Sequence, residues 1–221
     1  AEEHYGVIPA NADIAPRARP QEPPQNAERR VIFRDARVAT EYVSRSYIAP
    51  ERDPGAQEKA GALFLLAELL GGGQTSYMTE KLQFEQDIAV YTGAFYRGMS
   101  LDDTTFDVVI VPKPGASLEQ AEAAMDATLV SFIEDGVNVE DLDRIKMQIR
   151  ASQIYERDNV DGIARRYGAA LSSGLTVKDV QDWPNILQSV TPEDVIEAAR
   201  SVFRPETSVT GYLMKAQEVT Q

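Results

Sequence analysis

The chain has 221 residues, a formal net charge of −13, one histidine and no cysteine. The charge argues against nucleic acid or an anionic membrane surface as a partner, because both are bound through clustered Lys and Arg. The lack of cysteine excludes a thiol nucleophile, a Cys-ligated zinc and a disulfide framework, and it fits cytoplasm and periplasm equally well.

The first 27 residues predict a connector rather than a packed element. "AEEHYG" is typical of a helix tail stopped by Gly6, and residues 5–26 contain five prolines with little apolar periodicity. We expect residues 1–27 to link a preceding domain, absent from this chain, to a single domain over residues 28–216. The polar residues 217–221 predict a frayed tail.

The only histidine, His4, lies in this connector and is expected to be an exposed terminal side chain. A histidine-based zinc site needs two or three such ligands, and Ser-His-Asp or Cys-His chemistry needs a histidine near the nucleophile. The sequence therefore predicts no catalytic, metal-binding or cofactor-binding residue in this chain.

Residues 29–50, "RRVIFRDARVATEYVSRSYIAP", predict one or two strands ending before Pro50. The next stretch, "ERDPGAQ", predicts a turn with Pro54 in the first turn of a helix. That helix is expected to be deeply buried, because apolar residues recur on a wide face: Ala60, Leu63, Phe64, Leu66, Ala67, Leu69 and Leu70.

Three glycines, Gly71–Gly73, follow this helix. A phosphate-binding loop would need a preceding strand and a Lys directly after the glycines, but Lys81 is the first lysine to follow. The pattern instead predicts a helix C-cap, where glycine tolerates a left-handed backbone. Thr75 or Ser76 is expected to cap the next helix, with Met78 and Leu82 facing inward.

The rest of the chain predicts two more strands, at residues 88–98 and 104–114, and then a run of helices. Ser117 is expected to cap a helix to about Asp135, with Leu118, Ala121, Met125, Leu129 and Phe132 inward and Glu119 and Glu122 near its positive end. Further helices are expected over 136–158, 160–175, 176–187 and 191–203, before a last strand at 208–215. Strands, then helices, then a returning strand predict an α+β fold: a mainly antiparallel mixed sheet with helices on one face.

Two acidic groups and one basic group are candidates for chemistry. Asp102 with Asp103, and Glu140 with Asp141 and Asp143, fall at turns and helix starts, where acids stabilise dipoles; oxygen-only binding of a divalent ion at the first pair stays open. Arg165, Arg166 and Tyr167 on a helix either hold a carboxylate or line a solvated face. Trp183, before Pro184, is expected to anchor its helix on the core.

Residues 47–95, from "YIAPERDPG" to "DIAVYTGAF", resemble the second domain of pitrilysin-type (insulinase) zinc metallopeptidases, the group that includes mitochondrial processing peptidase. The resemblance lies in the Gly71–Gly73 turn, the helix start at residues 75–78, Leu82, and the strand opening at residues 88–90. "SVTPEDVIEAARSVFRPETSVTGYL" is similar to the closing helix and strand of that domain, and "YGVIP…ERRVIF" to its entry linker.

The resemblance implies a metallopeptidase/LuxS-like two-layer sandwich without catalytic residues of its own. The family's zinc site, His-x-x-Glu-His with a distant Glu, belongs to a preceding domain, so the parent protein would carry zinc in its N-terminal domain. The implied role is to pack on that domain and line a closed peptide chamber, with a second similar subunit and a peptide as partners. The alternative is a structural or assembly subunit that has lost catalysis.

The partner half of such peptidases uses an Arg and a Tyr, seven residues apart, to hold the substrate carbonyl. The resemblance aligns Gln83 and Val90 with these positions, and neither side chain has the required charge or hydroxyl. Tyr77 also replaces an expected Arg. Tyr91, one residue further along the strand, is expected to point to the opposite face from Val90. These departures favour the second domain of the zinc-bearing half, or the structural alternative.

Overall fold

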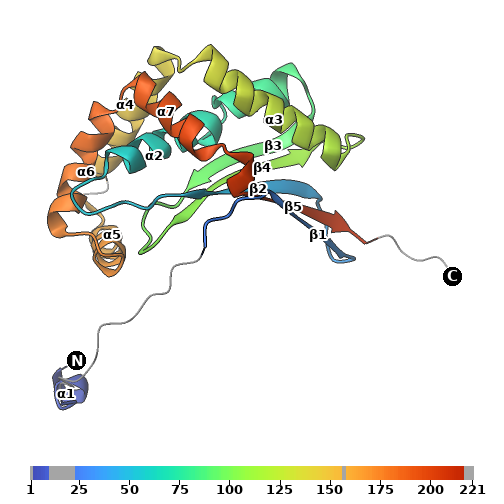
Figure 1. The fold of residues 1–221 in the computed structure, drawn as a ribbon. Helices are drawn as coiled ribbons and strands as arrows, with labels where there is room; N and C mark the ends of the chain where they lie inside the picture. The colour runs from blue at the N-terminus through green and yellow to red at the C-terminus, as the bar shows by residue number, and fades with distance from the viewer. Residues whose placement is uncertain (1, 10–22, 156–157, 217–221) are drawn as a thin grey trace.

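The computed structural model describes residues 2–9, 23–155 and 158–216. Its centre is a five-stranded sheet in the order β1-β5-β2-β4-β3, in which β1 and β5 are parallel and the other neighbours antiparallel (Figure 1). The strands are β1 Arg29–Asp35, β2 Tyr42–Ala49, β3 Ala89–Tyr96, β4 Thr104–Pro112 and β5 Ser208–Lys215. The predicted α+β fold with a mainly antiparallel mixed sheet is confirmed.

The helices follow the predicted order closely. They are α1 Glu2–Tyr5, α2 Glu58–Gly71, the π-helix η1 Thr79–Glu85, α3 Leu118–Asp135, α4 Val139–Tyr155, α5 Val160–Ser172, α6 Val177–Ser189, α7 Pro192–Val202 and the 3₁₀ turn η3 Pro205–Thr207. Ser117, Thr176 and Thr191 each form a capping box at the start of α3, α6 and α7. Local hydrogen bonding therefore sets where these helices begin.

The core lies between one face of the sheet and the helices packed over it. Helix α2 is buried along most of its length, and Leu63, Leu65, Leu66 and Leu70 have no exposed surface. Alternate residues of the central strands, such as Val43 and Phe106, point into this layer. Burial of each such side chain stabilises the fold by about 2 kcal/mol.

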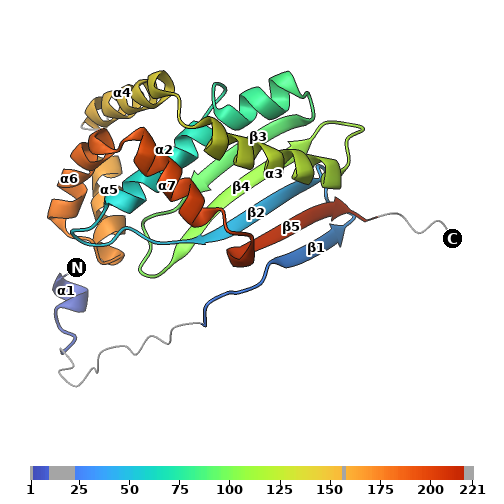
Figure 2. The ribbon, with the colours of Figure 1, turned by 45° about the horizontal axis from the view of Figure 1, so that its top comes forward.

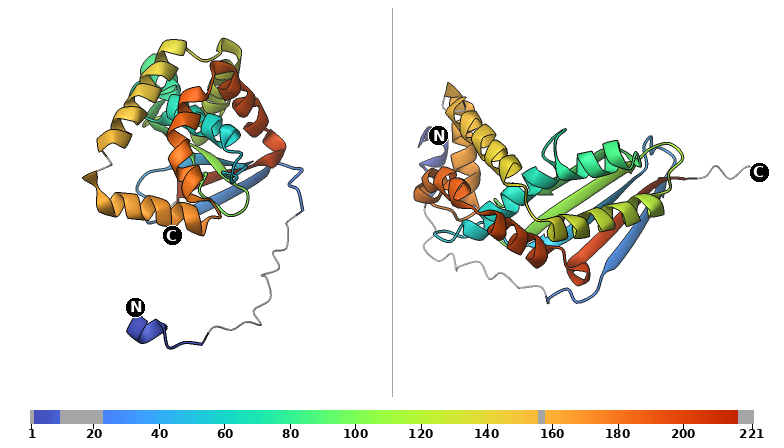
Figure 3. Two further views of the ribbon diagram at one scale, coloured as in Figure 1. Left: turned by 90° about the vertical axis from the view of Figure 1, so that its left-hand side faces the viewer. Right: turned by 90° about the horizontal axis from the view of Figure 1, so that it is seen from above.

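The opposite face of the sheet is left open. In Figure 1, α2, α3, α4 and α7 lie over the same face of the sheet, with α5 and α6 at one end, and no described element covers the other face; the end-on view in Figure 3 shows the same layering. Among the described residues, no helix combines the length and apolar character needed to cross a bilayer. The predicted connector is described only at residues 2–9 and 23–27, and the predicted tail, 217–221, lies outside the described residues.

The expected start of α2 is wrong. Pro54 lies in a turn closed by a bridge between Asp53 and Ala56, and α2 begins only at Glu58. Gly55 has φ +75°, and its N–H donates to Asp179 Oδ1 at 2.8 Å. A left-handed residue cannot continue a right-handed helix, so the contact with α6 delays the helix start.

The glycines do end α2, but not through a left-handed cap. Gly72, the C-cap residue, has φ −75°. Glycine is required instead at position 71, where a Cβ would come within 2.0 Å of the Ala94 nitrogen on β3. Glycine is needed there because the backbones of α2 and β3 approach too closely for a side chain.

Candidate functional site

Gln83, the first residue aligned with a family substrate position, lies on the π-helix η1 and is bonded inward. Its Nε2 donates to Thr92 Oγ1 at 2.9 Å and to Thr79 Oγ1 at 3.3 Å. Ser76 Oγ donates to Thr79 Oγ1 at 3.0 Å, and the Thr79 hydroxyl donates to Gly73 O at 3.2 Å. The Gln83 amide thus completes a buried hydroxyl network that ties η1 to β3. A π-helix often marks a functional segment, but here its polar groups satisfy one another.

Val90, the second aligned position, occupies a β-bulge. Ala89 pairs with Pro112 and Tyr91 with Val111, so Val90 is the extra residue of β3. Val90 is 56% exposed and Tyr91 is 47% exposed, whereas Ala89 and Thr92 are buried. The expected alternation between Val90 and Tyr91 is therefore interrupted by the bulge. The sequence offers no turn or Pro signal that would have indicated it.

The open face of the sheet carries a continuous apolar row. Tyr91 pairs with Val111, and Leu213 pairs with both Tyr42 and Phe33. The β2–β4 pairing ends at Val43 with Ile110, and the next residues on the two strands are Tyr42 and Val111. The row therefore crosses all the strands. Next to it, a Cβ on Gly93 would meet the Tyr91 hydroxyl and the Phe95 ring at 2.9 Å, so both aromatic side chains lean over this glycine on the open face.

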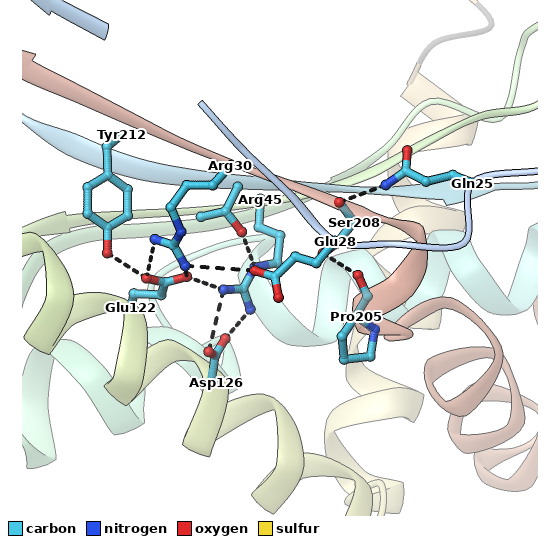
Figure 4. A network of polar contacts seen from close by, with 10 residues as sticks. Gln25, Glu28, Arg30, Arg45, Glu122, Asp126, Pro205, Ser208 and Tyr212 are labelled. Carbon is cyan, nitrogen blue, oxygen red and sulfur yellow. Dashed lines mark hydrogen bonds and ion pairs between the residues drawn. The ribbon is translucent and has the colours of Figure 1, made fainter. Parts of the chain in front are cut away.

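On the covered face, a polar cluster joins three strands to α3, as Figure 4 shows. The Glu122 carboxylate accepts hydrogen bonds from Arg30 Nη1 and Nη2 at 2.9 and 2.8 Å, from Arg45 Nη2 and from the Tyr212 hydroxyl. Arg45 also pairs with Asp126 and donates from Nε to Thr210 Oγ1 at 2.8 Å. This cluster was not expected.

The expected place of Glu122 in the helix dipole is wrong. Glu122 is 8% exposed and points at the sheet. Burial opposes its ionisation, but hydrogen bonds from Arg30 and Tyr212 outweigh burial and lower the pKa of Glu122. Burial raises the pKa of Tyr212 to about 12, and the bond to Glu122 acts in the same direction. A sequence signal did exist: Glu122 lies four residues after Leu118 and three before Met125, on the apolar face of α3. Arg45 shares the inward face of β2 with Val43 and Tyr47.

The other candidate residues do not form a site. Asp102 and Asp103 lie exposed in the β3–β4 loop. Asp141 pairs with Arg144 at 2.7 Å in the first turn of α4, as expected for a helix start. Tyr167 packs against the small cluster of Ala170, Leu175 and Val180, whereas Arg165 is exposed, so α5 does not gather them on one face.

No group of three or more His, Asp or Glu side chains that could hold a metal ion occurs among the described residues. His4 lies exposed on α1. Trp183 anchors α6 as expected: its ring packs edge-on against Phe64 at 6.1 Å, and the Arg52 guanidinium lies 3.8 Å from its centre.

Residues 1–149 match the family model described as the peptidase M16 inactive domain. The chain belongs to this family. The match confirms the resemblance to the non-zinc-binding domain of pitrilysin-type peptidases.

Named relatives of this inactive domain are longer proteins. It is 25% identical over 162 residues to an uncharacterised zinc protease of Streptomyces coelicolor, covering 72% of this chain and 35% of that protein. A protease from Helicobacter pylori has the same fold, with a TM-score of 0.86 at 20% identity, covering 96% of this chain and 50% of that one. The first half of the periplasmic protease PqqL from Escherichia coli gives a TM-score of 0.77 at 16% identity over 96% of this chain and 47% of that one. This chain thus spans between about a third and a half of the matched chains.

Proposed function

We propose that this M16 inactive domain is the second, non-catalytic domain of a zinc-dependent endopeptidase. It packs on a preceding domain that holds zinc through His-x-x-Glu-His, and it lines a closed chamber in which that domain cleaves peptides. The observation that carries the proposal is the family match together with the coverage of the Streptomyces zinc protease, which leaves room for a catalytic domain. The zinc of that preceding domain would catalyse peptide-bond cleavage, and this chain would form part of the chamber wall.

The open face of the sheet supports a packing role. Soluble monomers rarely expose a large contiguous apolar patch, yet Tyr91, Phe95 and Phe33 are all about half exposed on this face. A neighbouring domain laid over the apolar row would bury them.

The net charge of −13 would give the chamber wall an acidic character that favours basic or extended peptides.

A structural or assembly subunit of the same fold remains the second candidate. It is favoured by the state of the two substrate positions: the Gln83 amide is occupied by Thr79 and Thr92, and Val90 has no hydroxyl. Neither residue is suited to hold a substrate carbonyl. A second similar subunit would then bring both the zinc and the substrate contacts.

The deciding experiment combines this chain with the polypeptide encoded directly upstream. We expect that segment to contain His-x-x-Glu-His and the joined protein to cleave peptides only when zinc is present, while the 221-residue chain alone stays inactive. An upstream segment without the motif would overturn the peptidase role and favour the structural one. Zinc-dependent cleavage by the isolated chain would contradict both.

The packing role has its own test. Tyr91→Asp places a charge in the apolar row and is expected to weaken binding of the upstream domain. Phe84→Asp is the matched control, because Phe84 is more exposed still but lies on η1 instead. Equal binding by the two variants would argue against the open face as the docking surface.

A further inference from the structure

The outer edge of the sheet is an unpaired, exposed strand. β1 pairs only with β5, and the outward backbone groups of residues 29–35 have no strand partner among the described residues. Figure 2 shows β1 as the outermost strand, with no element beside it. Val31, Ile32 and Phe33 are exposed by 55%, 48% and 55%, so both faces of the strand are open as well. Edges of this kind pair with another strand unless something blocks them.

The order of residues along β1 is complementary to itself. If a second copy runs antiparallel with Ile32 opposite Ile32 of that copy, Val31 faces Phe33 of the second copy and Arg29 faces Asp35 of the second copy. Each of the last two contacts occurs twice, because a two-fold interface repeats every pair. Opposite charges and apolar pairs directly across strands are both stabilising.

The unfavourable pairing in this register, which the two-fold axis also repeats, is compensated on the Arg30 side. Arg30 faces Arg34 of the second copy, but the Arg30 guanidinium is held by both oxygens of Glu122 and lies 5.0 Å from the Tyr212 ring. Its charge is therefore balanced within its own chain. A shift by one residue in either direction would set an apolar residue opposite an arginine, Val31 against Arg34 or Phe33 against Arg30, which disfavours that register.

We propose that two copies of this chain associate through β1, pairing antiparallel about Ile32 and joining their two sheets into one. The partner is a second copy of the chain, and the contact does not depend on the peptidase role. The free edge supplies the backbone hydrogen bonds, and the Arg29 and Asp35 pairs set the register.

The first test is a charge exchange, measured by sedimentation velocity of the 221-residue chain over a range of concentrations. Asp35 is held locally by Arg37 at 2.7 Å, so all variants are made in an Arg37→Ala background, which itself should dimerise. Arg29→Asp alone and Asp35→Arg alone each create two like-charge pairs and should weaken association about tenfold or more. The double variant restores opposite charges and should recover it. A dimer insensitive to these changes, or a chain that stays monomeric throughout, overturns the proposal.

The second test uses the absence of native cysteine. Across an antiparallel pair, opposite Cα atoms lie about 4.5–5.5 Å apart, within the range of a disulfide. Ile32→Cys should therefore form an intermolecular disulfide rapidly under mild oxidation. Phe84→Cys, exposed but away from β1, gives the rate of random collision. Equal rates for the two variants would refute the β1 contact and leave the edge for a different partner, such as the preceding domain.

Discussion

Arg30 on the edge strand β1 donates from both terminal guanidinium nitrogens, Nη1 and Nη2, to the Glu122 carboxylate on α3, at 2.9 and 2.8 Å. The pair crosses from the outermost strand to the helical layer and shares its carboxylate with Arg45 and Tyr212. Because β1 has little other burial, this contact is its main side-chain anchor.

We expect Arg30→Ala to loosen β1 selectively. The Arg30 side chain is partly exposed, so the loss in unfolding free energy should be modest, about 1 kcal/mol. Amide exchange should accelerate in β1 and remain unchanged in β2 and β4. Arg34→Ala is the control, since Arg34 is exposed on the same strand; a similar effect from that variant would show that Arg30 has no special role.

Removing the carboxylate should be more damaging than removing Arg30. Glu122→Ala deprives Arg45, which is almost fully buried, of one of its two acidic partners. A buried charge without its partner costs about 3 kcal/mol. Urea unfolding of the two single variants should therefore rank Glu122→Ala well below Arg30→Ala. The reverse order would contradict the arrangement of the cluster.

The lowered pKa of Glu122 predicts acid sensitivity. A carboxyl whose pKa is depressed in the folded state stabilises the protein above its ordinary pKa of 4.5, and this stabilisation is lost as the pH falls through the depressed value. Asp126, whose pKa is raised by burial, acts in the opposite direction and partly offsets the slope. Stability measured from about pH 6 to pH 3 should fall less steeply in Glu122→Gln than in the natural chain. Parallel curves would mean that Glu122 does not titrate differently on folding.

Two of the three glycines at the end of α2, Gly71 and Gly73, allow a matched pair of substitutions. Gly71→Ala brings a Cβ to 2.0 Å from the Ala94 nitrogen and 2.6 Å from the Gly93 carbonyl carbon. Backbone atoms cannot yield easily, so we expect a loss of about 3 kcal/mol or more in unfolding free energy. Gly73→Ala meets nothing within 4 Å and should stay within about 0.5 kcal/mol of the natural chain. Comparable melting temperatures for the two variants would contradict the close α2–β3 approach.

The contact between Arg52 and Trp183 is expected to stabilise the fold. Arg52 is 7% exposed, stacks on the indole at 3.8 Å and donates from Nε to Gln57 Oε1 at 3.0 Å. Burial lowers its pKa to about 10. Lysine keeps the charge but lacks the flat fork, so Arg52→Lys should cost about 1–3 kcal/mol in urea unfolding. Lys59→Arg, on the exposed side of α2, serves as the control. An unchanged midpoint for Arg52→Lys would show that stacking contributes nothing.

The sequence alone determined the elements and most of their limits, because these depend on interactions within a few residues. The Ser117 and Thr191 caps, the inward positions of α3 and the alternation along β2 are all visible as local patterns. It also excluded a His-x-x-Glu-His zinc motif within these 221 residues, since that motif needs two histidines and the chain has one.

Only the tertiary structure decided what depends on distant segments meeting. The α2 start at Glu58 follows from the bond between Gly55 and Asp179, and the need for glycine at position 71 follows from the approach of β3. The burial of Glu122 became favourable only when the strands carrying Arg30 and Arg45 came to lie beneath α3. Such contacts join residues far apart in the chain, so a local pattern can place Glu122 and Arg45 on inward faces but cannot show which residues they meet.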